Sequence, residues 1–447
     1  MLRLPQELLQ QIIQDLFVRE EYTGGHLYSE AEAASKDDLL ACSRACRALR
    51  LVALPFLFRT VSFYINEDLT EATRVDIGFQ CRSLSGFTRL LDTCPAVREN
   101  VQELRVRSRF RPHIYGMVPV DVGELQVLFQ CLPRLCIVRL DGLFPDRHGV
   151  VPALALAATN IPTKTSPQTL QRFELCHPTH VSTDMPSYLV ELLCSFSSID
   201  TVNLVNISFL PVSAWQTLRP GVVPTVGIRC LDAMSCVNVD LLLSLLQVAL
   251  VQNRSMRSLL LSGCDYAHIA EFGDVLRSIG SDLVDLYLPL EVFQSMNGHS
   301  CEHRPLFLHL SLMFVITDDA TSVLVQCQSL EHLSIEFDVP GWVDETPEML
   351  LPMLAALHEH PLASLTRFTI VLIALYHPHE NLHEAASVLA PTESLLLQIP
   401  GLKQIALKFV DELGQEPDAE WYRWVLRDEL PTMLPNLHQS GILVAGG

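Results

Sequence analysis

The amino-acid sequence predicts an α/β protein in which a short helical region at the N-terminus precedes a long solenoid of strand–helix repeats. A six-residue apolar pattern, typical of a short half-buried strand, returns many times between residues 101 and 407. Segments with helical apolar spacing separate its copies, and the first 65 residues consist mostly of such segments. Hydrophobic residues make up 49% of the chain and charged residues 18%, which indicates a well-filled core.

The first expected element is an amphipathic helix over residues 2–17. Pro5 lies in its first turn, where proline is tolerated, and Glu7 lies near the positive end of the helix dipole. Because a helix of about four turns is marginal alone in water, its apolar stripe must be buried against this chain or against another protein. The stripe consists of Leu8, Leu9, Ile12, Ile13, Leu16 and Phe17.

Two further helices are expected before residue 65. Residues 18–36 contain two adjacent glycines and many small or acidic residues, so we interpret them as a surface insertion. Asp37 or Asp38 can cap the second helix, and Pro55 is expected to start the third. Residues 60–63 then leave this region as a strand.

The apolar positions of these helices follow a recognisable spacing. They run Leu4-Pro5-x-Glu7-Leu8-Leu9-x-x-Ile12-Ile13-x-x-Leu16, then Leu39-Leu40-x-Cys42-x-x-x-Cys46-Arg47-x-Leu49, and then Pro55-x-Leu57-Phe58-Arg59-x-Val61. The pattern resembles an F-box, most closely that of the F-box proteins with degenerate leucine-rich repeats that are abundant in fungi. It departs from the family at Leu49, where many members carry tryptophan, and in the length of the 18–36 insertion.

The resemblance implies a function in which this chain itself performs no chemistry. F-box helices pack on a Skp-family adaptor, which binds a cullin, while the rest of the chain captures a protein substrate for ubiquitin transfer. The resemblance therefore implies a substrate receptor without catalytic residues or cofactors. The alternative interpretation of the residues is that the three helices only cap the end of the solenoid. The positions implied to face the adaptor are Leu4, Pro5, Glu7, Leu8, Ile12, Leu39, Leu40, Cys46, Leu49, Pro55, Leu57 and Phe58.

Residues 66–447 are expected to form one substrate-binding solenoid, separate from the F-box at 1–65. Clear neighbouring copies of the strand pattern start 27 to 37 residues apart, and weaker copies near Ile228-Leu231 and Leu308-Leu310 fill two longer gaps. This period is typical of leucine-rich repeats, which stack into a horseshoe with a curved array of outward strand side chains. The clear copies are Val101-Leu104-Val106, Leu135-Val138-Leu140, Leu170-Phe173-Leu175, Ile199-Val202-Leu204, Met256-Leu259-Leu261, Leu283-Leu286-Leu288, Leu330-Leu333-Ile335, Leu365-Phe368-Ile370 and Leu402-Ile405-Leu407.

Residues 103–112 (ELRVRSRFRP) carry the most distinctive candidate substrate-binding residues. Arg105, Arg107, Arg109 and Arg111 alternate, so they project from one face if a strand continues through them. Such a positive patch suits an acidic or phosphorylated segment, and the alternative is a solvated strand face that discourages edge pairing. Other strand positions expected to face a substrate are Arg139, Glu174, Asn203, Tyr287, His332, Ser334, Arg367 and Lys403.

One motif favours an enzyme instead. Residues 379–383 (HENLH) fit the His-Glu-x-x-His pattern of zinc hydrolases, in which His379 and His383 would bind zinc and Glu380 would act as a general base. The motif lies in a proline-containing segment after a predicted strand, which argues against the helix that this pattern needs. Zinc hydrolysis is therefore a distant alternative, behind a repeat protein that binds partners without any role in a ligase.

The net charge and the cysteine content limit which kinds of binding partner and which cell compartment are expected. A net charge of −20 argues against nucleic acids and anionic membranes as partners. The thirteen cysteines show no paired spacing and are expected to be reduced thiols. No signal-peptide pattern opens the sequence, and the longest apolar stretch, residues 241–251, is too short to span a bilayer. We therefore expect a cytoplasmic or nuclear protein.

Overall fold

The computed structural model has an α/β fold whose strands pair in parallel, in agreement with the predicted class. The chain forms two compact units, unit 1 (Met1–His180 and Glu191–Ser198) and unit 2 (Val181–Val190 and Ile199–Gly447). The domain boundary expected at residue 65 stays a prediction. The structure describes residues 5–16, 30–65, 84–108, 118–146, 168–176, 185–209, 225–264, 269–289, 324, 326–338, 346–373, 389–410 and 419–445.

Three helices begin unit 1. The second starts at Glu30, so the end of the expected 18–36 insertion is helical, while residues 17–29 lie outside the described residues. Pro55 lies inside the third helix instead of starting a new one. The proline removes one backbone hydrogen bond, and the helix ends only two residues later, which keeps this loss small. The helices are α1 (Gln6–Leu16), α2 (Glu30–Ala45) and α3 (Arg47–Leu57).

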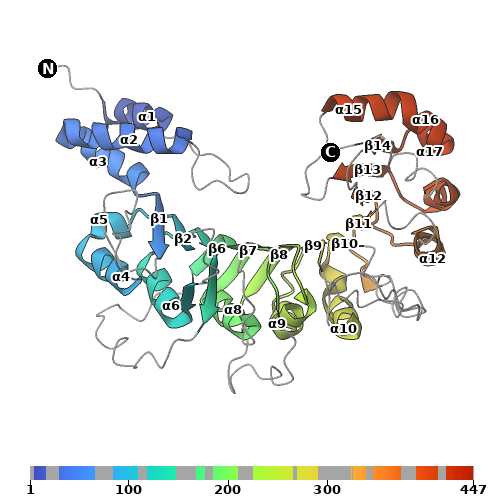
Figure 1. Cartoon of the computed structure of the whole chain (residues 1–447), viewed down its shortest axis with the longest axis horizontal. Coiled ribbons are helices and arrows are strands. Elements are labelled where there is room, and N and C mark those ends of the chain that lie inside the picture. The colour runs from blue at the N-terminus through green and yellow to red at the C-terminus, as the bar shows by residue number, and fades with distance from the viewer. Residues whose placement is uncertain are drawn as a thin grey trace, which may run out of the picture. The chain divides into compact units, whose positions relative to one another are not determined.

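The main sheet of unit 1 contains strands β1, β2, β4 and β6 in that order. The residues of the apolar pattern lie in register across it, since Leu104 pairs with Val138 and Val138 pairs with Phe173. All three are buried, and Figure 1 shows helices α4 and α6 on one side of these strands. The elements are β1 (Thr60–Ile65), α4 (Leu84–Thr93), α5 (Pro95–Arg98), β2 (Glu103–Ser108), β3 (Val118–Asp121), α6 (Val122–Cys131), β4 (Ile137–Asp141), β5 (Leu143–Asp146) and β6 (Gln168–Cys176), with β3 and β5 forming a separate pair.

Unit 2 repeats this arrangement over more strands, which follow one another from β7 to β14 in sequence order. Leu259 pairs with Leu231 on one side and Leu286 on the other, which places the weak copy near residue 228 in a strand. Strands β10 and β11 pair directly. The weak copy near residue 308 lies outside the described residues. The strands are β7 (Phe196–Val205), β8 (Gly227–Met234), β9 (Ser258–Ser262), β10 (Asp285–Pro289), β11 (His332–Asp338), β12 (Arg367–Ile373), β13 (Gln404–Val410) and β14 (Leu443–Ala445).

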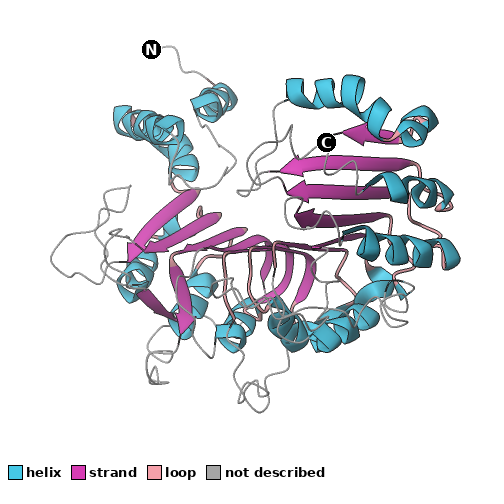
Figure 2. Ribbon diagram, turned by 45° about the vertical axis from the view of Figure 1, so that its right-hand side comes forward, coloured by secondary structure: helices cyan, strands magenta, loops and turns pink. Residues whose placement is uncertain are grey.

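Helices lie along one side of the unit 2 strands, as the turned view in Figure 2 shows for β11 to β13. The apolar pattern residues of each strand are buried toward these helices, and the alternate residues point to the opposite side. The helices of unit 2 and its boundary are α8 (Met185–Leu193), α9 (Val239–Asn253), α10 (Ile269–Ile279), η1 (Gly280–Asp282), α12 (Thr346–Glu359), η3 (Ala390–Thr392), α14 (Glu393–Gln398), α15 (Ala419–Trp424), η4 (Val425–Glu429), α16 (Leu430–Met433) and α17 (Pro435–Ser440).

The side of each sheet opposite its helices carries mostly polar residues, and we call it the strand face of that unit. In unit 1 the strand face includes Glu103, Arg105, Arg107, Arg139, Asp141, Arg172 and Glu174. In unit 2 it includes Ser258, Ser262, Asp285, Tyr287, His332, Ser334, Glu336, Arg367, Thr369 and Lys408, whose places follow from the strand registers.

Two buried thiols connect successive strands of unit 2. The thiol of Cys236, which follows β8, donates to the carbonyl oxygen of Leu204 on β7 at 3.6 Å. The thiol of Cys264, which follows β9, donates to the carbonyl oxygen of Ala233 on β8 at 3.3 Å. Each thiol therefore bonds one repeat to the repeat before it, at equivalent positions of the pattern.

Candidate functional site

One side of helix α1 belongs to the core of unit 1. Ile13 on α1 and Leu39 on α2 are buried, and the hydroxyl of Ser35 on α2 donates to the carbonyl oxygen of Leu16 at 2.6 Å. The last carbonyl groups of a helix have no partner within the helix, so this bond also satisfies the end of α1. The first helix is thus partly covered by its own chain.

A second side of α1 is apolar and exposed. Leu8 is 51% exposed and Ile12 is 46% exposed, and the two lie one helical turn apart. Leu51 on α3 is 65% exposed, although the sequence pattern did not single it out. Large apolar side chains grouped on one helix side are typical of surfaces that another protein covers. We call Leu8 and Ile12 the exposed face of α1.

The structure separates the residues implied to face an adaptor into two groups. Leu39, Leu57 and Phe58 are buried inside unit 1, and their contact with an adaptor stays a prediction. They pack inward because α2 and α3 have too little interior of their own and share one core. Leu4 lies outside the described residues. The residues still on the surface are Pro5, Glu7, Leu8, Ile12, Cys46 and Pro55, with Leu40 and Leu49 half-buried.

The strand face of unit 1 is a chain of buried ion pairs. The Nε of Arg105 lies 2.8 Å from the Oε1 of Glu103, and the Nε of Arg139 lies 3.0 Å from the same oxygen. The Nε of Arg139 also lies 3.2 Å from the Oε2 of Glu174, and the Oε1 of Glu174 lies 3.5 Å from the Nη1 of Arg172. Burial raises the pKa of Glu174 despite the opposing effect of Arg139 and Arg172. The acidic side chains alternate with the arginines and neutralise them.

This arrangement differs from both expectations for the arginines of residues 103–112. Arg105 and Arg107 do project from the same face, but they are buried, so they form neither a free positive patch nor a solvated strand face. Arg107 lies 3.8 Å from Asp141 on the neighbouring strand. Arg109 and Arg111 lie outside the described residues. The parallel register places Asp141 beside Arg107 and Glu174 beside Arg139. These carboxylates allow the guanidinium groups to be buried, because a buried charge without a partner is costly.

Glu336 is the centre of a hydrogen-bond network on the strand face of unit 2. Its carboxylate accepts hydrogen bonds from the Ser262 hydroxyl at 2.6 Å, from the Gly263 backbone at 2.9 Å and from the Tyr287 hydroxyl. Burial and the adjacent Glu336 carboxylate raise the pKa of Tyr287, so its hydroxyl keeps its proton. Tyr287, a predicted substrate residue, is therefore held in place by a carboxylate that the sequence prediction missed. The period-2 alternation of β11 is the signal that could have identified Glu336.

His332 lies in a second network beside the first. Its Nε2 is 2.7 Å from the Thr369 hydroxyl and 3.0 Å from the Ser334 hydroxyl. Its Nδ1 is 3.8 Å from Asp285, whose other oxygen accepts a hydrogen bond from Ser258 at 2.8 Å. Burial and the nearby Arg367 lower the pKa of His332, with a further contribution from Lys408, which favours the neutral ring.

Asp285, His332 and Ser334 are the residue types of a catalytic triad, in which an acid orients a histidine base that activates a hydroxyl group. However, the Ser334 and Thr369 side chains are almost fully buried, so a substrate carbonyl cannot reach either hydroxyl. The hydroxyl groups instead hold the imidazole in place. This cluster supports a binding surface rather than a catalytic centre.

Arg367 differs from the arginines of unit 1. It lies next to His332 in the register of β11 and β12, on the same face. Among the described residues it forms no ion pair, and its Nε is buried without a hydrogen-bond partner. A guanidinium group has five N–H donors, so Arg367 retains a strong capacity to bind an anionic group. Lys403, which was also expected to face a substrate, lies just before β13 and is exposed.

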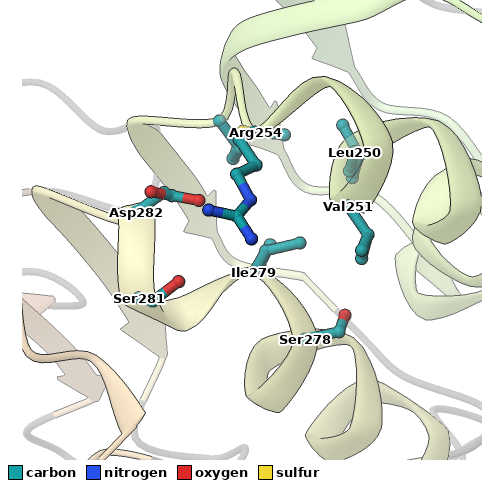
Figure 3. Close-up of a pocket in the computed structure, with 8 residues that line it drawn as sticks. Leu250, Val251, Arg254, Ser278, Ile279, Ser281 and Asp282 are labelled. Carbon is teal, nitrogen blue, oxygen red and sulfur yellow. The ribbon is translucent and has the colours of Figure 1, made fainter.

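The helix side of unit 2 contains a small pocket between the C-terminal ends of α9 and α10. Figure 3 shows Arg254 extending across it toward Asp282, with Ile279 below. Arg254 ends α9 in a left-handed conformation, with φ of 45°. Val251, which also lines the pocket, is exposed on α9. This pocket is distinct from the strand face and contains no cluster of titratable groups among its lining residues beyond Arg254 and Asp282.

The zinc-hydrolase motif of His379, Glu380 and His383 lies outside the described residues and stays a prediction. Across the described ranges, no group of three His, Cys, Asp or Glu side chains could hold a metal ion. Every helix in the described part of the chain is too short or too polar to cross a membrane.

Comparison with known proteins adds no assignment to these surfaces. No protein-family model matches the chain, and no curated protein matches it. The exposed face of α1 and the two strand faces are the surfaces of the described residues that bear on function.

Proposed function

We propose that this chain is the substrate receptor of a Skp/cullin/F-box ubiquitin ligase. In this proposal the N-terminal helices are an F-box that docks on a Skp-family adaptor, and the strand–helix repeats are leucine-rich repeats that bind a protein substrate. The chain performs no chemistry itself. It raises the rate of ubiquitin transfer by holding the substrate close to the other subunits. The proposed compartment is the cytoplasm, the nucleus or both.

The observation that carries the proposal is the second apolar side of α1. Ile13 uses one side of the helix for the core of unit 1, while Leu8 and Ile12 remain exposed on another side. A helix that only capped the solenoid would need a single apolar side, since its outer side would face water. Two apolar sides favour a helix that also contacts a second protein.

Co-expression of the full chain with a Skp-family adaptor tests the docking surface. We expect a stable complex in size-exclusion chromatography and its loss in Leu8→Asp and Ile12→Asp, because either change puts a charge into an apolar contact. Gln14→Asp is the matched control, since Gln14 is an exposed residue of the same helix and lies away from Leu8 and Ile12. It should retain the complex.

Two outcomes would contradict the proposal. The first is the absence of any complex with the wild-type chain. The second is a complex that persists in both aspartate variants while their melting temperatures match that of the Gln14→Asp control. A complex lost only through unfolding would show as a lower melting temperature of the isolated variant, which separates the loss of docking from the loss of fold.

A second candidate function is a repeat protein that binds partners without a ligase. The observation that favours it is the half-exposed polar network around Tyr287 and His332, which can bind a partner whether or not an adaptor is present. A purified chain that binds no adaptor but still binds a peptide on this face would support this second candidate.

A further inference from the structure

One row of side chains crosses the strand face of unit 2 at right angles to the strands. The row consists of Asp285 on β10, His332 on β11 and Arg367 on β12, which the registers align, and Ser258 on β9 lies beside Asp285. Side chains that pair across parallel strands lie side by side, so the row is continuous. A ligand that contacts several of its members must run across the strands, not along them.

The two ends of this row carry opposite charges that remain accessible. The Asp285 side chain is 40% exposed and that of His332 is 28% exposed. The Ser258 hydroxyl uses one oxygen of Asp285, and the other oxygen is 3.8 Å from the His332 ring. Arg367 has no carboxylate partner among the described residues, and its Nε is a buried donor without an acceptor. An anionic group brought by a ligand would accept hydrogen bonds from the terminal nitrogens of the Arg367 guanidinium group, which are not among its buried atoms.

The distance between the charges sets the length of the ligand. Neighbouring strands lie about 4.8 Å apart, so the backbone positions of Asp285 and Arg367, two strands apart, are separated by about 10 Å. A peptide in the extended polyproline II conformation rises about 3.1 Å per residue and has three residues per turn, so side chains three positions apart point to the same side and cover this separation. His332, whose pKa is lowered, stands between the charges as a neutral ring that can donate or accept a hydrogen bond.

We propose that this row binds an extended protein segment carrying a basic and an acidic residue about three positions apart. The basic side chain pairs with Asp285, and the acidic side chain pairs with Arg367. The proposal names the substrate class of the proposed receptor and rests on that function for its biological meaning. The binding itself does not require an adaptor.

The charges favour a protein segment over a nucleic acid or a free phosphate. A polyanion would meet the Asp285 carboxylate at one end of the row, and the net charge of −20 repels it at long range. A segment with both signs of charge meets a complementary group at each end. A segment that placed an acidic residue at Asp285 or a basic residue at Arg367 would be repelled. The row therefore selects both the sign of the charges on the segment and the spacing between them.

Fluorescence anisotropy with the purified full chain, without adaptor, tests the proposal. The probe is an eight-residue peptide of threonine and glycine with one lysine and one aspartate three positions apart. Comparison peptides lack the lysine, lack the aspartate or lack both. We expect the peptide with both charges to bind best, and Arg367→Gln to weaken its binding by about tenfold, because a charge-assisted hydrogen bond is lost.

Two further variants test whether the effect is specific to Arg367. Arg254→Gln, on the helix side of the same unit, should leave peptide binding unchanged. Arg367→Glu should lose the peptide with both charges and instead prefer one in which lysine replaces the aspartate, which would show direct contact. Equal binding of the charged and uncharged peptides, no binding at all, or wild-type binding by Arg367→Gln would each overturn the proposal. None of these results depends on whether an adaptor binds α1.

Discussion

The strand faces of the two units place arginine in opposite situations. In unit 1, Arg105 and Arg139 share Glu103, and Arg139 reaches a second carboxylate on Glu174. In unit 2, Arg367 occupies a comparable place on a strand but has no ion-pair partner among the described residues. Both faces come from the same alternation of strand side chains. The partner residues, not the backbone, decide whether a face is internally satisfied or able to bind.

The same architecture thus carries one face whose charges pair within the chain and one face that we propose to bind a ligand. Buried ion pairs do not add much net stability, but removal of one partner is strongly destabilising. A charge without a partner contributes little to folding and keeps its interaction capacity for a ligand. Changes on the two faces should therefore have very different effects on stability.

The largest effect is expected for Glu103→Gln in unit 1. The change removes the carboxylate shared by Arg105 and Arg139 and leaves two buried guanidinium groups with fewer partners. We expect a loss of about 3 kcal/mol in the free energy of unfolding, measured from the urea midpoint of the purified chain. A loss below about 0.5 kcal/mol, typical of surface substitutions, would break the contrast between the faces.

A smaller effect is expected from pH, through His332 in unit 2. Its pKa is lowered in the folded state, so the unfolded chain binds more protons when the pH falls below about 6.5. Stability supplied by the neutral ring is present above that pH and is lost as the pH falls toward the folded-state pKa. His332→Gln should therefore lose less stability than the wild type between pH 7 and pH 5. Parallel pH profiles for the two proteins would contradict this.

The smallest effect on stability is expected for Arg367→Gln. Arg367 has no ion pair to lose among the described residues. The free energy of unfolding of the Arg367→Gln variant should therefore differ from that of the wild type by less than about 0.5 kcal/mol. Urea unfolding beside Glu103→Gln gives the direct comparison. A loss comparable to that of Glu103→Gln would mean that Arg367 supports the fold and that the two faces are alike.

The repeat pattern in the sequence predicted the strands better than the sites. Spaced apolar residues such as Leu259 and Leu286 identify buried strand positions without knowledge of their neighbours, and they pair in register in the structure. The N-terminal helices were located, but Pro55 did not mark a boundary because one lost hydrogen bond near a helix end costs little. The α/β class could therefore be predicted from the spacing of apolar residues alone.

The state of the charged residues could not be predicted in the same way. Glu174 is 35 positions beyond Arg139 in the sequence, and only the strand register brings them together. The same holds for Glu336 and Tyr287, which lie on neighbouring strands joined by a long connection. The apolar pattern gives the register of neighbouring strands, but it does not show which charged side chains are buried or which atoms form ion pairs.

The thiols of Cys236 and Cys264 have a consequence for how unit 2 unfolds. In a linear array each repeat contacts only its neighbours, so cooperativity depends on the coupling between adjacent repeats. Each thiol adds one hydrogen bond to this coupling, between β7 and β8 and between β8 and β9. Partial unravelling that starts at the C-terminal end of unit 2 should therefore meet a small added resistance at these strands, since a thiol is a weak donor.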